Sequence, residues 1–184
     1  MTVVLIIVSV ILLIFVVAAI SPKDFLISSE IIINTTQSRV RDIVRLLDNQ
    51  KKYSVRVMQD PNTVITYTGT DGQVGAIQTR DSQDKVVGAG SQEITDITSG
   101  SSYQVTIKFQ RPMIATNYAK TELIAIDDTH TKVMTSFWGT SPWPMNLMTA
   151  IIKPKLLKDL SQTLTNLKAL AEKPLPPIFS STID

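Results

Sequence analysis

Cysteine is absent from the 184-residue chain, and histidine occurs once, at position 130. The sequence therefore holds no disulfide framework, no thiol nucleophile and no thiolate metal site. One histidine cannot complete a common zinc site, and carboxylates alone would offer only a loose site for a hard cation. The sequence predicts neither a bound metal nor a cofactor.

Phosphate-binding glycine loops, the P-loop and the G-x-S-x-G turn of hydrolases are also missing. His130 ends the polar run that begins at Asp127, so we interpret it as a solvated turn residue and not as a buried base. The formal net charge is +2, and the Lys and Arg residues are scattered along the chain. A nucleic-acid binder would show clustered basic residues with interleaved aromatics, so nucleic acid is not an expected partner.

Charge is missing altogether from the first 20 residues, where only Thr2 and Ser9 are polar. As a helix, this stretch would be about 30 Å long, which is the thickness of a bilayer's hydrocarbon core. It has no polar stripe to face water, unlike a helix on a protein surface. A cleavable signal peptide would have a basic start and a shorter apolar core, and residues 17–19 are only a weak cleavage site. Residues 1–21 are therefore predicted to form a single-pass anchor in the cell membrane.

The side of the membrane on which the rest of the chain lies stays open. Only the amino terminus precedes the span, whereas Lys23, Arg39 and Arg41 follow it. Basic residues within about 20 residues of a span tend to be cytoplasmic. The count favours a cytoplasmic domain, but three residues so widely spaced do not decide the orientation.

The residues after the anchor number about 160, enough for one compact domain with a sizeable core. Their pattern predicts a strand at 25–33, a helix at 35–47 and then a series of antiparallel strands. Those strands are expected at 63–69, 73–80, 85–97, 103–111, 114–126 and 132–140. Asp71-Gly72 predicts a tight hairpin turn, and Gly88 with Gly90 predicts a bulge.

The helical period returns near the carboxyl end. Residues 145–152 are expected to form one short helix, and Pro154 to lie in the first turn of a second helix. In that second helix the apolar residues Leu156, Leu160, Leu164 and Leu167 recur at helical spacing and form one stripe. The stripe must pack on the concave face of the sheet. Residues 22–173 are the expected domain, and the Pro-rich residues 174–184 are the expected tail.

The predicted elements follow the order strand, helix, antiparallel strands and long C-terminal helix. This is the order of the α+β helix-grip fold, in which a curved sheet wraps around the C-terminal helix. Several segments also carry a family resemblance: Gly75-Ala76, 87–91 with Ile94, Phe109, Pro112, 131–133, 138–139, 144–148 and 164–168. They resemble the START-like polyketide cyclase/dehydrase and lipid-transport superfamily (SRPBCC). The chain looks most like its bacterial branch, in which one membrane helix precedes the domain. The resemblance spans residues 23–172. The sequence departs from that branch in two places. Residues 51–56 lack the tryptophans that the branch has there, and Arg80-Asp81 stands where the branch has an aromatic residue and a glycine.

The resemblance implies an elongated apolar cavity between the sheet and the C-terminal helix. Methionine adapts to irregular shapes, and Trp or Tyr offers a polar handle to a mostly apolar ligand. No catalytic residue is predicted, because the strand carboxylates Glu93, Asp96 and Glu122 are expected to face outward. The residues predicted to line the cavity are Phe109, Tyr118, Phe137, Trp138, Trp143, Met145, Met148, Leu160 and Leu164.

The expected function is binding of a hydrophobic small molecule or lipid by a membrane-tethered module, without catalytic turnover. Two alternatives stay open. One is a cyclase, dehydratase or hydrolase-type enzyme that uses an inward Tyr or carboxylate. The other is a non-binding interaction domain whose own side chains fill the core. An open apolar space favours binding, and a closed core favours the interaction domain.

Overall fold

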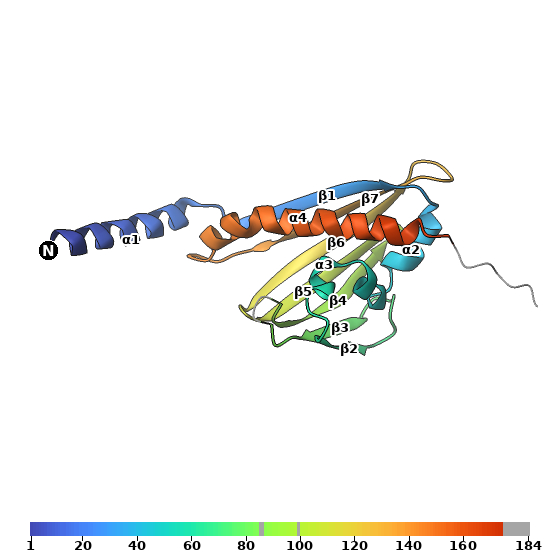
Figure 1. Ribbon diagram of the computed structural model, residues 1–184, viewed down its shortest axis with the longest axis horizontal. Helices are drawn as coiled ribbons and strands as arrows, with labels where there is room; N and C mark the ends of the chain where they lie inside the picture. Colours follow the sequence, from blue (N-terminus) through green and yellow to red (C-terminus); the bar gives the residue numbers. More distant parts are fainter. Residues whose placement is uncertain (85–86, 99, 175–184) are drawn as a thin grey trace, which may run out of the picture.

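A computed structural model describes residues 1–84, 87–98 and 100–174, so most of the predicted tail, residues 175–184, lies outside the described part. The chain folds into one long N-terminal helix followed by a sheet that carries helices on one face (Figure 1). The elements are α1 (Thr2–Ile20), β1 (Asp24–Ile33), α2 (Gln37–Val44), η1 (Asp48–Lys52), α3 (Val55–Met58), β2 (Val64–Thr68), β3 (Ile77–Asp81), β4 (Ala89–Thr98), β5 (Ser102–Arg111), β6 (Ala115–Ala125), β7 (Thr131–Thr140) and α4 (Asn146–Ala171).

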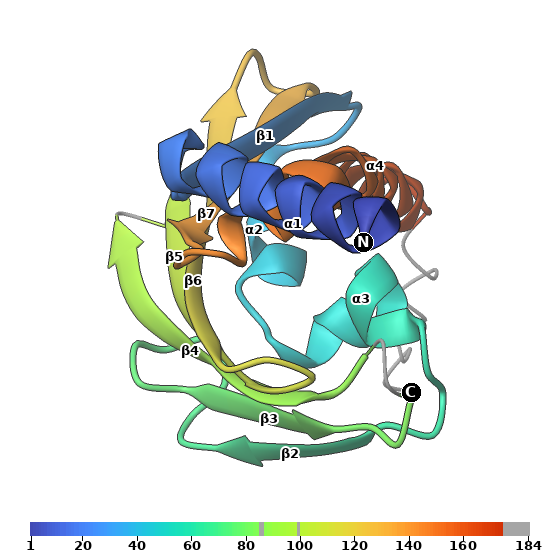
Figure 2. The ribbon, with the colours of Figure 1, turned by 90° about the vertical axis from the view of Figure 1, so that its left-hand side faces the viewer.

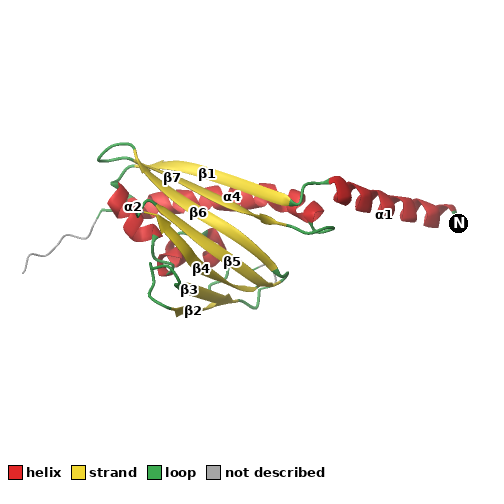
Figure 3. Cartoon of the chain, turned by 180° about the vertical axis from the view of Figure 1, so that it is seen from behind, coloured by secondary structure: helices red, strands yellow, loops and turns green. Residues whose placement is uncertain are grey.

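The sheet has seven antiparallel strands in the order β1-β7-β6-β5-β4-β3-β2. It curves from β1 round to β2, and α4 and α3 lie on the side toward which it curves (Figure 2). Figure 3 shows the other, convex face, which the helices leave uncovered. The predicted α+β helix-grip architecture is confirmed, because a curved antiparallel sheet carries a long C-terminal helix.

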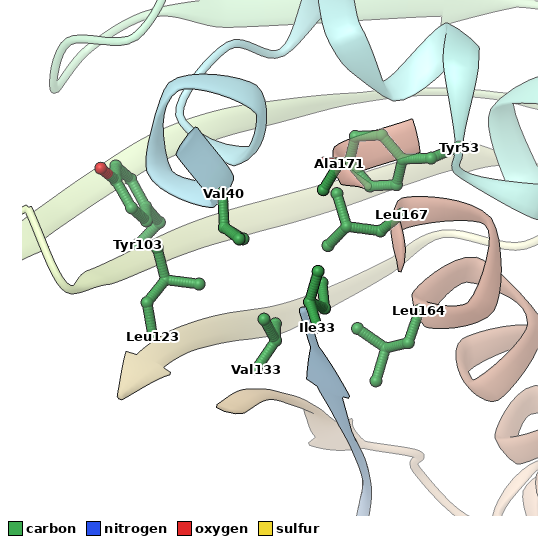
Figure 4. Packing of buried hydrophobic residues seen from close by; sticks show 9 residues of the cluster. All are labelled: Ile33, Val40, Tyr53, Tyr103, Leu123, Val133, Leu164, Leu167 and Ala171. Atoms are coloured by element: carbon green, nitrogen blue, oxygen red, sulfur yellow. The ribbon is translucent and has the colours of Figure 1, made fainter. Parts of the chain in front are cut away.

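The buried core lies at the end of the sheet where β1 and α4 finish. Its members come from every layer and are Ile33, Val40, Tyr53, Tyr103, Leu123, Val133, Leu164, Leu167 and Ala171 (Figure 4). Polar contacts fix α4 along β1. The hydroxyls of Ser29 and Ser161 form a hydrogen bond of 3.0 Å, and Lys168 donates to the Ile32 carbonyl at 2.6 Å. The predicted leucine stripe therefore packs on the sheet at this end.

Two local predictions need correction. The first concerns α4, which is one continuous helix with Pro154 inside it and not two helices. Proline removes one intrahelical donor, but the Ala150 carbonyl that loses it is on an exposed stretch that water can reach. The helix can therefore continue through Pro154, although such a residue costs about 3 kcal/mol relative to alanine.

The second correction concerns Asp71-Gly72. Strands β2 and β3 do pair as a hairpin, but their connection runs from residue 69 to residue 76 and is no two-residue turn. Asp71 accepts hydrogen bonds from the backbone N–H groups of Leu47 and Asp48, at 2.8 and 3.1 Å. The longer loop thus docks on the segment after α2, a contact that the local turn signal does not contain.

The predicted bulge near Gly88 and Gly90 is confirmed by a register shift between Ala89 and Gly90. Gly88 has φ +66°, and a Cβ there would lie 2.1 Å from the Arg111 carbonyl oxygen. A Cβ on Gly90 would lie 2.5 Å from the Lys108 carbonyl oxygen. No side chain fits either approach of strand β5, so glycine is required at both positions.

Helix α1 is long and apolar enough to span a membrane by length and composition, and it projects away from the sheet (Figure 1). Its side chains are exposed except near the carboxyl end, where Ala18 is fully buried. That end contacts the start of α4. The ring of Phe15 lies 5.3 Å from the ring of Trp143, and the Trp143 indole N–H donates to the Phe15 carbonyl at 3.4 Å.

Candidate functional site

The concave face of the sheet is closed at one end and partly open at the other. At the closed end, Ile33, Leu123 and Val133 are at most 2% exposed. Toward the end where α1 joins, Ile27 is still buried, but the other apolar side chains on the same face of the strands are half-buried. We call this set the apolar floor, and it consists of Phe25, Val105, Ile107, Phe109, Ala119 and Phe137.

Strand register places the floor residues beside one another. Ala119 of β6 lies directly between Val105 of β5 and Phe137 of β7. The ring of Phe25 lies 5.6 Å from the ring of Phe137. Because neighbouring strands are about 4.8 Å apart, the floor runs continuously across four strands.

The leucine stripe of α4 shows the same change from closed to open. Leu164 and Leu167 are 2% and 1% exposed. One and two turns earlier in the stripe, Leu160 and Leu156 are only half-buried, and Ile152, one turn before Leu156, is 42% exposed. The stripe is therefore fully buried near the carboxyl end of α4 and only half-buried nearer its amino end.

A groove of about 410 Å³ lies beside this stripe, between α3 and α4. Its lining is mixed apolar and polar, and consists of Val55, Met58, Gln59, Lys155, Asp159 and Asn166. Hydrogen bonds fix its walls, because the Val55 N–H donates to the Thr163 hydroxyl at 3.1 Å and Asn166 donates to the Tyr53 carbonyl at 3.1 Å. The short helix α3 thus forms the second wall, facing α4.

A buried polar network borders the floor on the side of β3. Gln92 donates to the side-chain oxygens of Gln50 and Gln78, at 2.7 and 3.2 Å. Gln78 donates to the Leu47 carbonyl and to the Tyr67 hydroxyl, both at 3.1 Å. These bonds satisfy the buried amides and hold β2, β3 and β4 against η1. The alternation of Gln78 with Ala76 and of Gln92 with Ile94 was a sequence signal for their inward direction.

Arg80 is the next inward residue of β3 after Gln78. It pairs in register with Ile65 on one side and Gly90 on the other, and its side chain is half-buried. Burial lowers the pKa of the Arg80 guanidinium, and repulsion from nearby Arg56 lowers it further. Among residues 1–84, 87–98 and 100–174, none forms a hydrogen bond or ion pair with this guanidinium. The sequence prediction did not include Arg80 among the site residues.

The predicted lining residues fall into four groups. Phe109 and Phe137 belong to the floor, and Leu160 faces it from α4. Leu164 belongs to the closed core. Three predicted residues lie at the junction with α1 and form the third group. They are Trp143, Met145 and Met148, which are 47%, 37% and 49% exposed.

Tyr118 and Trp138 form the fourth group, and they correct the prediction. They pair in register and their rings stack at 5.8 Å. Each is offset by one residue from a floor residue of the same strand, Ala119 or Phe137, so each points to the opposite face. Both side chains lie on the convex face and do not line any space between the sheet and α4.

Groups suited to acid–base chemistry do not gather at the floor. Glu93, Asp96 and Glu122 alternate with inward residues and lie on the convex face, as expected. Burial raises the pKa of the Tyr53 phenol and of the Tyr103 phenol, so neither is activated as a base at neutral pH. In the described part of the chain, no three His, Asp or Glu residues cluster as metal ligands would.

His130 lies in the turn between β6 and β7, as predicted. Its Nδ1 is 2.9 Å from the Asp127 carboxylate, and the Thr129 N–H donates to the same carboxylate at 2.7 Å. These contacts stay within the turn, and both side chains are largely exposed. His130 therefore has a local structural role in this turn, away from the floor.

Comparison with known proteins supports the fold. No protein-family model matches the sequence, and no curated protein does. Among solved structures, truncated norcoclaurine synthase from Thalictrum flavum has a TM-score of 0.63 at 11% identity, covering 85% of this chain and 98% of that one. Protein CV1439 from Chromobacterium violaceum has a TM-score of 0.59 at 15% identity, covering 81% and 98%. Hypothetical protein jhp0584 from Helicobacter pylori has a TM-score of 0.60 at 12% identity, covering 80% and 88%. The chain has the helix-grip fold that these proteins share.

Proposed function

We propose that the chain is a membrane-tethered module that binds a hydrophobic small molecule or lipid between the sheet and α4, without catalytic turnover. Residues 1–21 would be the anchor and residues 22–173 the binding domain. The observation that carries the proposal is the change along α4, whose stripe is buried at Leu164 but only half-buried at Leu160 and Leu156, together with the half-buried floor of the sheet. Apolar surface on both sides of an opening is what a hydrophobic ligand would cover.

Three further points support this function over the alternatives. The floor side chains are half-buried and not fully buried, which argues against a fully self-filled domain. The strand carboxylates face outward, which leaves the enzyme alternative without an inward acid. Norcoclaurine synthase from Thalictrum flavum, of similar fold, was solved in complex with dopamine and hydroxybenzaldehyde, so this fold can hold small aromatic molecules, which favours ligand binding over the self-filled domain alone.

The position of α1 supports the tethering part of the proposal. The helix leaves the domain at the open end of the floor, beside the first turns of α4 (Figure 1). A span inserted in a bilayer would therefore keep the opening close to the surface where apolar ligands partition. Tethering raises the effective concentration of such ligands at the site without any new contact.

The function can be tested by photolabelling the full chain in phosphatidylcholine nanodiscs with a diazirine-bearing long-chain alcohol. We expect labelled peptides from α1 and, separately, from β5, β6 and β7. Ala119→Phe fills the centre of the floor and should abolish the strand labels while leaving the α1 label. Thr116→Phe, an exposed position on the convex face of the same strand, is the matched control and should change neither.

Each part of the proposal has its own contrary result. Absence of label on α1 would contradict the membrane anchor. Equal strand labelling in the wild type, in Ala119→Phe and in Thr116→Phe would contradict binding on the floor. Circular dichroism of both variants checks that the added ring leaves the fold intact.

A further inference from the structure

The unpaired guanidinium of Arg80 is the most unusual feature of the inner face. Charged side chains are seldom withdrawn from water unless an opposite charge or several hydrogen bonds compensate. Arg80 is half-buried on the concave face, and no described residue provides either form of compensation. Its nearest carboxylate in sequence, Asp81, points to the opposite face and pairs with Arg111.

The surroundings of Arg80 add positive charge. Arg56 of α3 is close enough to repel it, and Lys155 lines the neighbouring groove. The one carboxylate among these groups is Asp159, which lies 3.5 Å from the Arg56 Nε and is thereby already engaged. Asp60 is held by the Ser82 hydroxyl and by the Asn62 N–H. The carboxylates of Asp159 and Asp60 are therefore engaged elsewhere, and the only charged neighbour of Arg80 among the described residues is the like charge of Arg56.

Arg80 also lies in line with the apolar floor. The register across the strands runs from Arg80 to Gly90 and from Gly90 to Phe109. Because Gly90 has no side chain, strand β4 places none between Arg80 and Phe109 along this row. From β3 to β1 the sheet crosses five strand spacings, or about 24 Å along its curved surface. That path is comparable with an extended long acyl chain.

We propose that Arg80 binds the oxyanion head of an amphipathic ligand whose hydrocarbon chain lies on the apolar floor. The head is a carboxylate or a phosphate, since the guanidinium fork matches both by paired hydrogen bonds. The ligand class is then a long-chain fatty acid or a single-chain phospholipid, and Arg56 and Lys155 add a favourable field at the groove. This inference rests on the proposed function and names the ligand class of the same site.

The test compares diazirine probes that share one hydrocarbon chain and differ in the head: an acid, a lysophosphatidate and a neutral alcohol. The full chain is labelled in phosphatidylcholine nanodiscs, and the yield on β5, β6 and β7 is divided by the yield on α1. We expect at least one anionic probe to exceed the alcohol by about tenfold or more, since paired hydrogen bonds between a guanidinium and an oxyanion are stronger than those to a neutral hydroxyl. The stronger of the two anionic probes identifies the head.

Arg80→Gln should reduce the anionic yield to that of the alcohol and leave the alcohol yield unchanged. Arg45→Gln is the matched control, because Arg45 is exposed and pairs with Asp42 on α2, and it should change neither yield. If Arg80→Gln does not fold, Arg80→Lys keeps the charge and loses the fork, and should lower the anion-to-alcohol ratio several-fold.

The outcomes separate the two proposals. Equal yields for all three probes on the floor, or an anionic preference that persists in Arg80→Gln, would overturn the role of Arg80 and leave hydrophobic binding standing. A loss of anionic and alcohol labelling together in Arg80→Gln would also overturn it, because a purely structural residue gives that result. No strand labelling by any probe would contradict the proposed function itself.

Discussion

The side-chain amide of Asn146 donates a hydrogen bond of 2.7 Å to the carbonyl oxygen of Ala18. The same amide also donates to the Ser21 carbonyl at 3.0 Å, and Asn146 is only 2% exposed. The last turn of an α-helix leaves its carbonyls without intrahelical donors. One residue at the start of α4 thus binds two carbonyls at the end of α1 and fixes this helix to the rest of the fold.

We expect Asn146→Ala to loosen the attachment of α1 without unfolding the sheet and the helices packed on it. Leaving the Ala18 carbonyl unsatisfied costs about 1–3 kcal/mol, which is enough to free a junction held by few contacts. The chain has no cysteine, so Val8→Cys and Gln110→Cys give two unique sites for spin labels. The distance distribution between them in nanodiscs should be narrow in the parent and broad in Asn146→Ala.

Asn62→Ala is the control for this substitution, because Asn62 is an exposed loop asparagine and its loss should leave the distribution narrow. A distribution that is equally narrow in all three proteins would show that Asn146 does not fix α1. In that case the opening of the floor would be oriented by other contacts.

Leu164→Ala should destabilise the domain by about 2–5 kcal/mol, as a large-to-small change in a closed core. Leu164 packs within the cluster formed by β1, β7 and the carboxyl end of α4. Thr165→Ala, one position along and exposed, should change the free energy of unfolding by no more than about 0.5 kcal/mol. Urea titrations of the full chain in detergent micelles provide both values. Similar small effects would contradict the packing of the stripe on the sheet.

Most of the fold could be predicted because its signals are local. The succession of strands along the chain follows from alternation between turns, and the α4 stripe follows from the spacing of Leu156, Leu160, Leu164 and Leu167. The prediction of a tight turn at Asp71-Gly72 was wrong because the conformation of this loop depends on a long-range contact of Asp71 with Leu47 and Asp48. Continuity of α4 through Pro154 likewise depends on solvent exposure, which a local rule does not include.

The site was predicted less well than the fold, and β7 shows the reason. One of its faces carries Val133 and Phe137, and the other carries Met134 and Trp138, so apolar alternation does not say which face is inside. Arg80 was missed for the opposite reason. A charged residue on a strand is normally expected to face water, and only the register with Gly90 shows that it points inward.

The turn between β6 and β7 gives a prediction for pH. Hydrogen bonds lower the pKa of Asp127 to about 2. The largest contribution comes from the Thr129 N–H, and the next comes from the His130 side chain. A carboxyl whose folded pKa is below its unfolded value stabilises the fold above the unfolded value, and that stability is lost as the pH falls through the folded value. Carboxyl-carbon NMR should give a midpoint near pH 2 for Asp127 in the folded chain. In urea the midpoint should return to about 3.9.

His130→Ala should raise the Asp127 midpoint only in part, because the Thr129 N–H remains as the larger cause. A folded-state midpoint close to that measured in urea would contradict the hydrogen-bonded turn.

Native mass spectrometry of the full chain, released from mild detergent after purification from membranes, tests ligand binding on the floor most directly. We expect a bound species with the mass of a single-chain or other lipid, retained in Thr116→Phe and lost in Ala119→Phe, because only the latter fills the space between Val105 and Phe137. The contrary result is the mass of the protein without ligand in all three proteins, both before and after incubation with fatty acids and single-chain lipids. That result would contradict the account and favour a domain that binds no hydrophobic ligand.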